Sequence, residues 1–140
     1  MTEIIKHTIE SIKPDTPPLT MEEVTDLTAH FQFQFPESYL DIIRFIDGGE
    51  GAVGPDSWIC LFTLKGLADC NNNYSFLMSQ IPDYFLIGKD AADTGYAFHK
   101  TNGTFHSFGL MSNFNTDPIE YMGRDFYEFL ETLYNYRFPN

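Results

Sequence analysis

The stretch that decides the fold is "YFLIGKDAADTGYAFHKTNGTFHSF", residues 84–108. Three runs rich in aromatic and apolar residues alternate here with two short turns, a pattern typical of strands joined as hairpins. Asn102 and Gly103 in the second turn are a strong hairpin signal, because both residue types accept positive φ. The stretch therefore predicts three consecutive antiparallel strands.

The first turn of this stretch carries two carboxylates, Asp90 and Asp93, and could instead be a metal or phosphate loop. A calcium loop of the EF-hand type needs more oxygen ligands and a closing Glu. A phosphate loop is glycine-rich and begins a helix, whereas a strand follows this turn, and two carboxylates would repel a phosphate. The sequence favours a hairpin turn in which Asp side chains accept hydrogen bonds from turn amides.

Helical patterns lie on both sides of the three strands. Thr20 and Glu23 have the spacing of a capping box, which predicts a helix from about residue 21. Pro36 suits the start of the next helix, and Gly48 and Gly49 end its apolar spacing. The C-terminal segment has apolar residues at helical spacing: Phe126, Phe129, Leu130 and Leu133.

Together these patterns predict an α+β fold: a single domain with a central antiparallel β-meander, flanked by N-terminal helices and a C-terminal helix. Residues 58–63 add a strand before the meander. We expect residues 50–57 to form a loop, and residues 64–80 to hold one short helix and an irregular loop. Residues 1–18 are predicted to be an N-terminal helix and a proline-rich linker, and residues 19–140 the α+β domain.

The chain of 140 residues has 20 acidic and 8 basic residues, a net charge of −12. This charge argues against binding nucleic acid through its phosphates and against adsorption to an anionic membrane. An acidic surface suits a basic protein partner. The first 13 residues mix charged and apolar residues, unlike a signal peptide, and two cysteines make no disulfide framework. We therefore expect a cytoplasmic protein.

The two histidines near the second turn are the only candidates for metal ligands. If Asn102 and Gly103 form a two-residue loop, His99 lies directly opposite His106. Zinc needs a third or fourth protein ligand, and the sequence offers no candidate at a suitable spacing. We predict no metal and no cofactor.

The sequence has no motif for nucleophilic catalysis. It lacks a G-x-S-x-G elbow, and neither Cys60 nor Cys70 lies in a recognisable activating context. The glycine-rich residues 47–51 follow a helix instead of beginning one, so they cannot direct a helix N-terminus at a phosphate. Paired carboxylates for hydrolysis stay open as an alternative, because 20 acidic residues supply many chance pairs. We predict that the protein is not an enzyme.

Several short motifs, over about residues 20–133, resemble the SUKH superfamily, which includes fungal Smi/Knr-type cell-wall regulators and bacterial immunity proteins. The matching pieces are Pro-x-x-Tyr at positions 36–39, the helix-ending glycines at 48–49, Ile-Gly at 87–88 followed by Asp90, and the helix near residues 126–130. The resemblance implies a SUKH-like α+β domain with no known catalysis.

The resemblance also implies a protein-binding function, because bacterial members are thought to neutralise polymorphic or contact-dependent toxins, often nucleases, by direct binding. An acidic inhibitor suits a nuclease that must be basic to hold phosphates. The predicted contacts are acidic loop residues: Asp47, Glu50, Asp56, Asp90 and Asp93. Two alternatives are a regulatory or scaffold domain of the fungal type and a metal-binding enzyme that uses His99 and His106.

Overall fold

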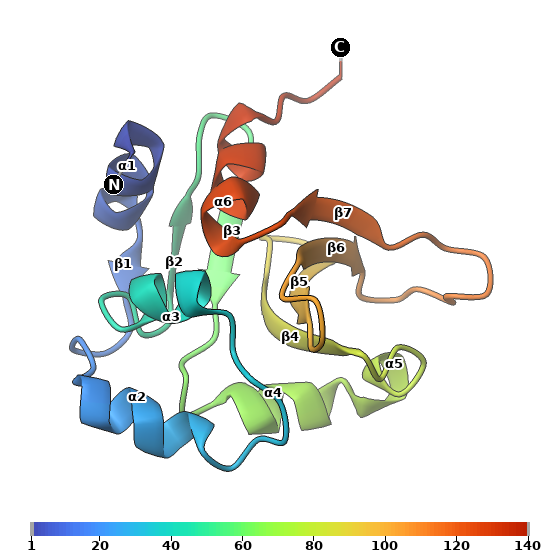
Figure 1. The fold of residues 1–140 in the computed structure, drawn as a ribbon. Coiled ribbons are helices and arrows are strands. Elements are labelled where there is room, and N and C mark those ends of the chain that lie inside the picture. Colours follow the sequence, from blue (N-terminus) through green and yellow to red (C-terminus); the bar gives the residue numbers. More distant parts are fainter. Residues whose placement is uncertain (1, 140) are drawn as a thin grey trace.

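The computed structural model describes residues 2–139 and confirms the predicted α+β domain (Figure 1). A single sheet contains seven strands in the order β1-β2-β3-β4-β5-β6-β7, and every neighbouring pair is antiparallel. Along the chain, the elements are α1 (Glu3–Ser11), β1 (Lys13–Pro14), α2 (Met21–Thr28), α3 (Glu37–Ile43), β2 (Gly49–Ala52), β3 (Trp58–Leu61), α4 (Leu67–Asn73), α5 (Ser75–Met78), β4 (Tyr84–Lys89), β5 (Thr94–His99), β6 (Phe105–Gly109), β7 (Glu120–Gly123) and α6 (Phe126–Asn135).

The central strands bury both of their faces, because successive side chains point to opposite sides of a sheet. Phe98 and Phe105 lie on the face that packs against α1, α3 and α6. Leu86, Ala97 and Phe108 lie on the other face, against α5 and the loop that follows β6. The helices therefore form unequal layers on the two sides of the meander (Figure 1).

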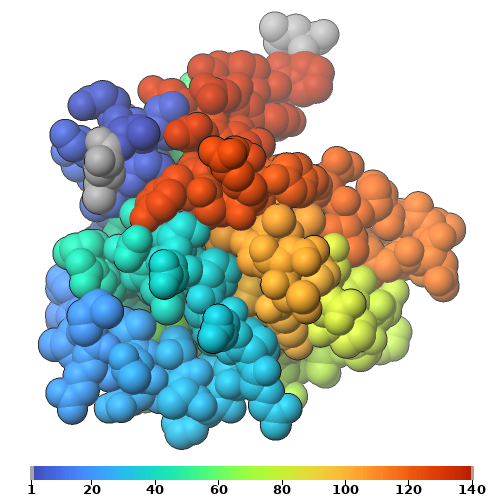
Figure 2. All heavy atoms as spheres, in the orientation of Figure 1, coloured from blue at the N-terminus to red at the C-terminus, as the bar shows by residue number. Residues whose placement is uncertain are grey.

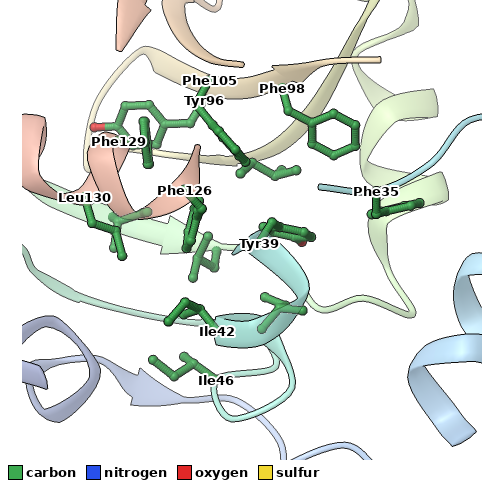
Figure 3. Close-up of a cluster of buried hydrophobic side chains, with 14 of the residues drawn as sticks. Phe35, Tyr39, Ile42, Ile46, Tyr96, Phe98, Phe105, Phe126, Phe129 and Leu130 are labelled. Carbon is green, nitrogen blue, oxygen red and sulfur yellow. The ribbon is translucent and has the colours of Figure 1, made fainter. Parts of the chain in front are cut away.

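An aromatic cluster joins the sheet to its helices (Figure 3). The Tyr39 ring, from α3, lies 6.1 Å from the ring of Phe98 in β5 and 5.4 Å from the ring of Phe126 in α6. Phe126 in turn lies 5.2 Å from Phe105. These rings have almost no exposed surface. Each such pair adds about 0.5–1.5 kcal/mol beyond the burial of its area, so the cluster is a main source of stability.

The predicted helix starts are largely confirmed. Thr20 and Glu23 form the capping box at α2: Thr20 Oγ1 accepts the Glu23 N–H at 3.1 Å, and Glu23 Oε1 accepts the Thr20 N–H at 3.0 Å. Pro36 lies at the N-cap of α3, just before the helix. At α6, Ser38 Oγ accepts the Phe126 N–H at 2.9 Å, which fastens the start of the last helix to α3.

Three short strands were not predicted: β1, β2 and β7. Strand β2 lies partly in the segment 50–57. A loop was expected there because the sequence "GEGA" has almost no β propensity. Gly49 has φ of 126°, and a Cβ there would stand 2.2 Å from the carbonyl oxygen of Lys13. The glycine is therefore what allows β1 to pair with β2.

Residues 64–80 contain two short helices, α4 and α5, where one was expected. Asn71 of α4 explains how this region is fixed to the sheet. Its side-chain amide donates to the carbonyl of Leu86 at 2.8 Å and accepts the Leu86 N–H at 2.8 Å. A β-bulge follows Leu86 in the β4–β5 pairing. The Asn71 amide thus takes the place of a neighbouring strand at this part of β4.

The β5–β6 hairpin has a longer turn than the predicted two-residue loop. Phe98 pairs with Phe105, and the His99 N–H donates to the carbonyl of Thr104 at 2.8 Å. His99 Nδ1 accepts the N–H groups of Thr101 at 3.2 Å and Asn102 at 3.1 Å. The imidazole therefore stabilises the wider turn. The pairing register of β5 with β6 differs from the predicted one by two residues. Each side chain therefore stays on the face of the sheet where it was expected.

The N-terminal segment shares its core with the rest of the domain. Ile5 and Ile12 are buried in the same cluster as the aromatic rings. The His7 ring lies 5.8 Å from the ring of Tyr134 in α6, and Ser11 Oγ donates to the carbonyl of Ala52 at 2.7 Å. Figure 2 shows α1 (blue) directly against α6 (red). The first helix is thus part of the fold's packing.

We expect Ile5→Ala to lower the free energy of unfolding by about 2–4 kcal/mol, because it leaves a cavity in this core. The exposed Glu10→Ala in the same helix is the control and should change it by less than about 0.5 kcal/mol. Urea denaturation followed by circular dichroism measures both values. Equal effects of the two variants would show that α1 is only loosely attached.

Candidate functional site

A groove of about 850 Å³ lies at one end of the sheet. Its walls are the loop between β2 and β3, the turn between β4 and β5, strand β7, and the C-terminal part of α6 with the tail that follows. Tyr96 and Ser107 of the central strands also line it. Figure 1 shows the β2–β3 loop beside α6. Ligand sites commonly have volumes of about 300–1,000 Å³, so the groove is a candidate binding site.

Exposed aromatic residues border this groove. Half of the eight large apolar residues that are exposed among residues 2–139 line it: Trp58, Tyr121, Tyr136 and Phe138. The ring of Tyr121 itself packs 5.7 Å from the ring of His106, on the face of the sheet opposite Ser107. Soluble proteins rarely expose contiguous apolar surface without a use for it. The clustering therefore marks the groove as a surface for a partner or ligand.

The groove is also acidic. Asp56 lies in the β2–β3 loop, Asp90 in the β4–β5 turn, and Glu120 at the start of β7, and all three line the groove. None of the described residues that line it is Lys, Arg or His. Carboxylates in a concave site concentrate negative potential, so the groove favours a cationic ligand.

Of the five predicted contact residues, the fold brings Asp56 and Asp90 together in this groove. Asp93 lines a smaller adjoining groove of about 460 Å³, which shares Glu120 with the larger one. Glu50 is exposed on β2, where its Oε2 accepts the Trp58 Nε1–H at 3.4 Å. These four acidic residues therefore lie in or beside connected surface features.

Asp47, the fifth predicted contact, is buried and unavailable to a partner. Its Oδ1 accepts the Leu64 N–H at 2.8 Å, and its Oδ2 accepts the Thr16 Oγ1–H at 2.8 Å. Asp47 follows the end of α3 and supplies an acceptor to two segments that are separate in the sequence. Asp47 is thus a structural residue that links the N-terminal linker to the segment after β3.

The structure confirms that Asp90 belongs to a hairpin turn. Its Oδ1 accepts the N–H groups of Ala92 at 2.8 Å and Thr94 at 3.0 Å, as expected for an Asp that stabilises a turn. Asp56 is fixed in a similar way, because its Oδ2 accepts the Phe138 N–H at 2.9 Å. Each of the two carboxylates is therefore held in place through one of its own oxygens.

Hydroxyl groups tie the walls of the groove to one another. Ser57 Oγ donates to the carbonyl of Leu133 in α6 at 2.7 Å. The Tyr96 hydroxyl donates to the carbonyl of Trp58 at 3.2 Å, and Thr132 Oγ1 donates to that of Met122 at 2.7 Å. Burial, with the nearby Asp90 charge, raises the pKa of Tyr96 well above its ordinary value, so its hydroxyl stays a donor. The groove is therefore largely preformed.

His99 and His106 lie on one face of the sheet but not opposite each other, because of the wider turn. Tyr84 contacts both, with ring centroids 5.0 Å from His99 and 5.1 Å from His106. His99 Nδ1 accepts turn amides, and His106 Nε2 lies 2.7 Å from Thr104 Oγ1. Within residues 2–139, no three His, Cys, Asp or Glu side chains come together as a metal site.

Both cysteines are free thiols and partly buried. Burial is the main cause that raises the pKa of Cys60, and likewise that of Cys70. Because the thiolate is the reactive form, neither group is prepared for nucleophilic attack at neutral pH.

No local pattern in the sequence indicates the aromatic part of the groove. Trp58 belongs to strand β3, as its sequence predicts, and Tyr136 and Phe138 follow the last helix of the described residues. Glu120 and Tyr121 lie in β7, which was not predicted. The only available signal was that these aromatic residues fall outside the helical stripes that account for the core.

We expect Asp47→Ala to lower the free energy of unfolding by about 1–3 kcal/mol, because it leaves the buried Leu64 N–H without its acceptor. Asp47→Asn keeps an acceptor oxygen and should cost less. The exposed Asp93→Ala serves as the control. Thermal or urea denaturation compares the three, and an Asp47→Ala protein as stable as the Asp93→Ala protein would contradict the structural role.

A pH titration should show a lowered pKa for His106. Burial lowers it below the ordinary value of 6.5, the His99 charge adds to this, and a hydrogen bond with the Glu120 backbone opposes it. The unfolded chain therefore takes up this proton at higher pH than the folded one, so stability should fall as pH drops below about 6.5. NMR titration measures the pKa, and His106→Gln should remove this part of the acid sensitivity. A His106 pKa at or above 6.5 would contradict the prediction.

None of the helices in residues 2–139 combines the length and apolar character needed to cross a bilayer.

Comparison with known proteins identifies one family. No curated protein matches the chain. The family model described as "SMI1 / KNR4 family (SUKH-1)" matches residues 18–132, from the linker before α2 to the last turns of α6. This match covers most of the chain, including the sheet from β2 to β7, and the protein belongs to the SMI1/KNR4 family of the SUKH type.

Proposed function

We propose that this protein is a non-catalytic immunity protein, which binds and neutralises a cognate toxin in the cytoplasm. The observation that carries the proposal is the groove: three acidic residues line it, exposed aromatic residues border it, and no described cationic residue lines it. Aromatic residues with a surrounding polar rim are typical of protein interfaces. Membership of the SUKH type supports binding to a protein.

The charge of the chain supports a basic partner. With a net charge of −12, the protein attracts cationic surfaces over a distance of about a Debye length, near 8–10 Å at physiological salt. Toxins that cleave nucleic acid carry clustered Lys and Arg to hold phosphates. An acidic inhibitor can then cover the toxin's nucleic-acid cleft and associate rapidly.

Three of the hydroxyl groups in the groove serve the fold itself. Ser57, Tyr96 and Thr132 donate to main-chain carbonyls, and therefore serve to hold the walls together. A nucleophile would instead need a general base beside it. We propose that the protein acts by binding and needs no cofactor or metal.

We propose Glu50, Asp56, Asp90 and Asp93 as partner contacts, with Glu120 added by the structure. A stable interface covers about 800 Å² on each partner, more than the groove alone provides. The groove is then the centre of the interface, and Glu50 and Asp93 belong to its rim.

The first test is affinity capture from the native host, followed by co-expression of the captured protein with the chain. We expect a basic protein that stops growth when expressed alone and is harmless when this chain is present. A captured protein that is not toxic would contradict the immunity role and would favour a regulatory or scaffold domain. A chain that is isolated with stoichiometric zinc would contradict the absence of a metal.

The second test reverses charge at the interface. Asp93→Lys with Glu120→Lys should slow association with the captured partner by about tenfold and weaken its dependence on salt. Glu22→Lys with Asp26→Lys on α2 is the matched control, since both residues are exposed and away from the groove. Stopped-flow fluorescence measures the rates. Equal slowing by the two double variants would indicate that only net charge matters.

A further inference from the structure

We propose that Ser107 and Glu120, with Thr94 beside them, form a subsite that accepts the ammonium group of a lysine side chain of the partner protein. This inference rests on the proposed function, because it identifies a group of the partner that the groove would bind. The subsite needs only one carboxylate and two hydroxyl groups, which the strand pairing brings together, and it can be tested without the natural partner.

The pairing of strands β5, β6 and β7 places these side chains on one face of the sheet. Tyr96 lies opposite Ser107, and Ser107 lies opposite Glu120. The three side chains therefore form a row on the face where the Tyr96 ring packs 5.2 Å from the ring of Phe129 in α6 (Figure 3). Side chains opposite each other on neighbouring strands have Cβ atoms about 4.5–5.5 Å apart, so Ser107 and Glu120 are direct neighbours.

Thr94 adds a second hydroxyl group to the same face. It lies two residues before Tyr96 in β5, so the two side chains point to the same side of the sheet. Thr94 pairs with Gly109, two residues after Ser107, and is therefore a diagonal neighbour of Ser107. Thr94, Ser107 and Glu120 all line both the larger and the smaller groove. They therefore lie where the two grooves meet.

The Ser107 hydroxyl is a buried polar group that the fold leaves unused. Only 8% of the Ser107 surface is exposed, and its Oγ takes part in no hydrogen bond among residues 2–139. The atom is not one of the fully enclosed side-chain atoms that lack a partner, so it opens on the two grooves that the residue lines. Buried polar groups are normally hydrogen-bonded, so this hydroxyl is available to a ligand.

Glu120 supplies the charge of the subsite. The residue is exposed, and its carboxylate takes part in no ion pair within the described part of the chain. No described Lys, Arg or His lines either groove. Asp56, Asp90 and Asp93 line the same two grooves and add to the negative potential without having to touch the ligand. A cation that enters either groove is therefore attracted, and Glu120 lies where the two grooves meet.

The oxygen atoms of the subsite suit an ammonium group. Hydroxyl and carboxylate oxygens accept hydrogen bonds, and an ammonium group has three donors and no acceptor. Charge-assisted N–H···O bonds are about 2.7–2.9 Å long, so one nitrogen can bond two oxygens up to about 5.6 Å apart. Ser107 and Glu120 are close enough for this. A guanidinium group is best served by the two oxygens of one carboxylate, which would leave the Ser107 hydroxyl unused.

The wall beside the subsite suits the stem of a lysine. Lysine buries its methylene groups along apolar surface while its charged head stays among polar groups. Met122 and Leu133 line the larger groove and pack in or against the main core cluster. Thr132 Oγ1 donates to the Met122 carbonyl at 2.7 Å and fixes β7 to α6. An apolar stem can therefore follow this wall while its ammonium group meets Glu120, two residues before Met122 in β7.

The test is a peptide titration of the ¹⁵N-labelled protein, followed by two-dimensional NMR. The probes are three capped tripeptides of glycine with lysine, acetyl-lysine or arginine in the middle. Acetyl-lysine keeps the stem and lacks the charge. We expect the lysine peptide to shift the amide signals of Thr94, Ser107 and Glu120 saturably, with a Kd of about 1 mM. The acetyl-lysine peptide should bind about fivefold more weakly, and the arginine peptide about threefold more weakly.

Single variants assign the response to the subsite. Glu120→Gln removes the charge and should weaken binding of the lysine peptide by about fivefold. Ser107→Ala removes only the hydroxyl and should weaken it by about threefold. The control Glu22→Gln, at an exposed position on α2, changes the net charge as Glu120→Gln does and should bind normally. The dispersed amide signals in each spectrum show that the variant is folded.

Equal binding of the lysine and acetyl-lysine peptides, tighter binding of the arginine peptide, or shifts that leave out Ser107 and Glu120 would overturn the inference. So would equal losses in Glu120→Gln and Glu22→Gln, or a Ser107→Ala protein that binds as tightly as the unchanged chain. If the chain neutralises a toxin but does not bind the lysine peptide, the proposed function stands and this inference fails. If it binds the lysine peptide and its captured partner is not toxic, the subsite stands and the immunity role fails.

Discussion

The mutual packing of Tyr39, Phe98 and Phe126 is the contact on which the rest of the structure depends. The three rings come from α3, β5 and α6, and all are fully buried. Aromatic rings are rigid and have preferred edge-to-face distances, so they set how closely the helices approach the sheet. Among residues 2–139 the Tyr39 hydroxyl has no hydrogen-bond partner, a cost of about 1–3 kcal/mol that the burial of three rings offsets. The position of α6, and with it one wall of the groove, follows from this packing.

Most of the fold could be predicted from the sequence because its main elements have local signals. The capping box at Thr20 and Glu23 and the apolar spacing from Phe126 to Leu133 are complete within one or two helical turns. Strands β1, β2 and β7 have two to four residues each and no alternating pattern, because their pairing comes from tertiary contacts. The register of the β5–β6 hairpin depended on His99, whose side chain stabilises the turn, and propensity rules for Asn-Gly do not include such a contact.

The candidate site was less predictable for a different reason. Asp56 and Asp90 were recognised as acidic loop residues, but Asp47 has the same chemistry and is buried. Only the fold decides whether a carboxylate serves internal amides or faces solvent. The aromatic half of the groove comes from segments as far apart as Trp58 and Phe138, which no local pattern connects. The family match, which supports the proposed protein-binding function, begins at residue 18 and ends at residue 132, before Tyr136 and Phe138.

The contact between α1 and α6 has a consequence for how this protein is made. A helix of nine residues is too short to be stable alone in water, and α1 packs against α6, which is synthesised much later. The helix α1 therefore stays without its final packing until α6 has left the ribosome. A chain that terminates before α6 leaves Phe98 and Phe105 uncovered, and is exposed to proteases and chaperones that recognise such surfaces. The release of α6 from the ribosome thus allows α1 and the sheet to complete their packing together.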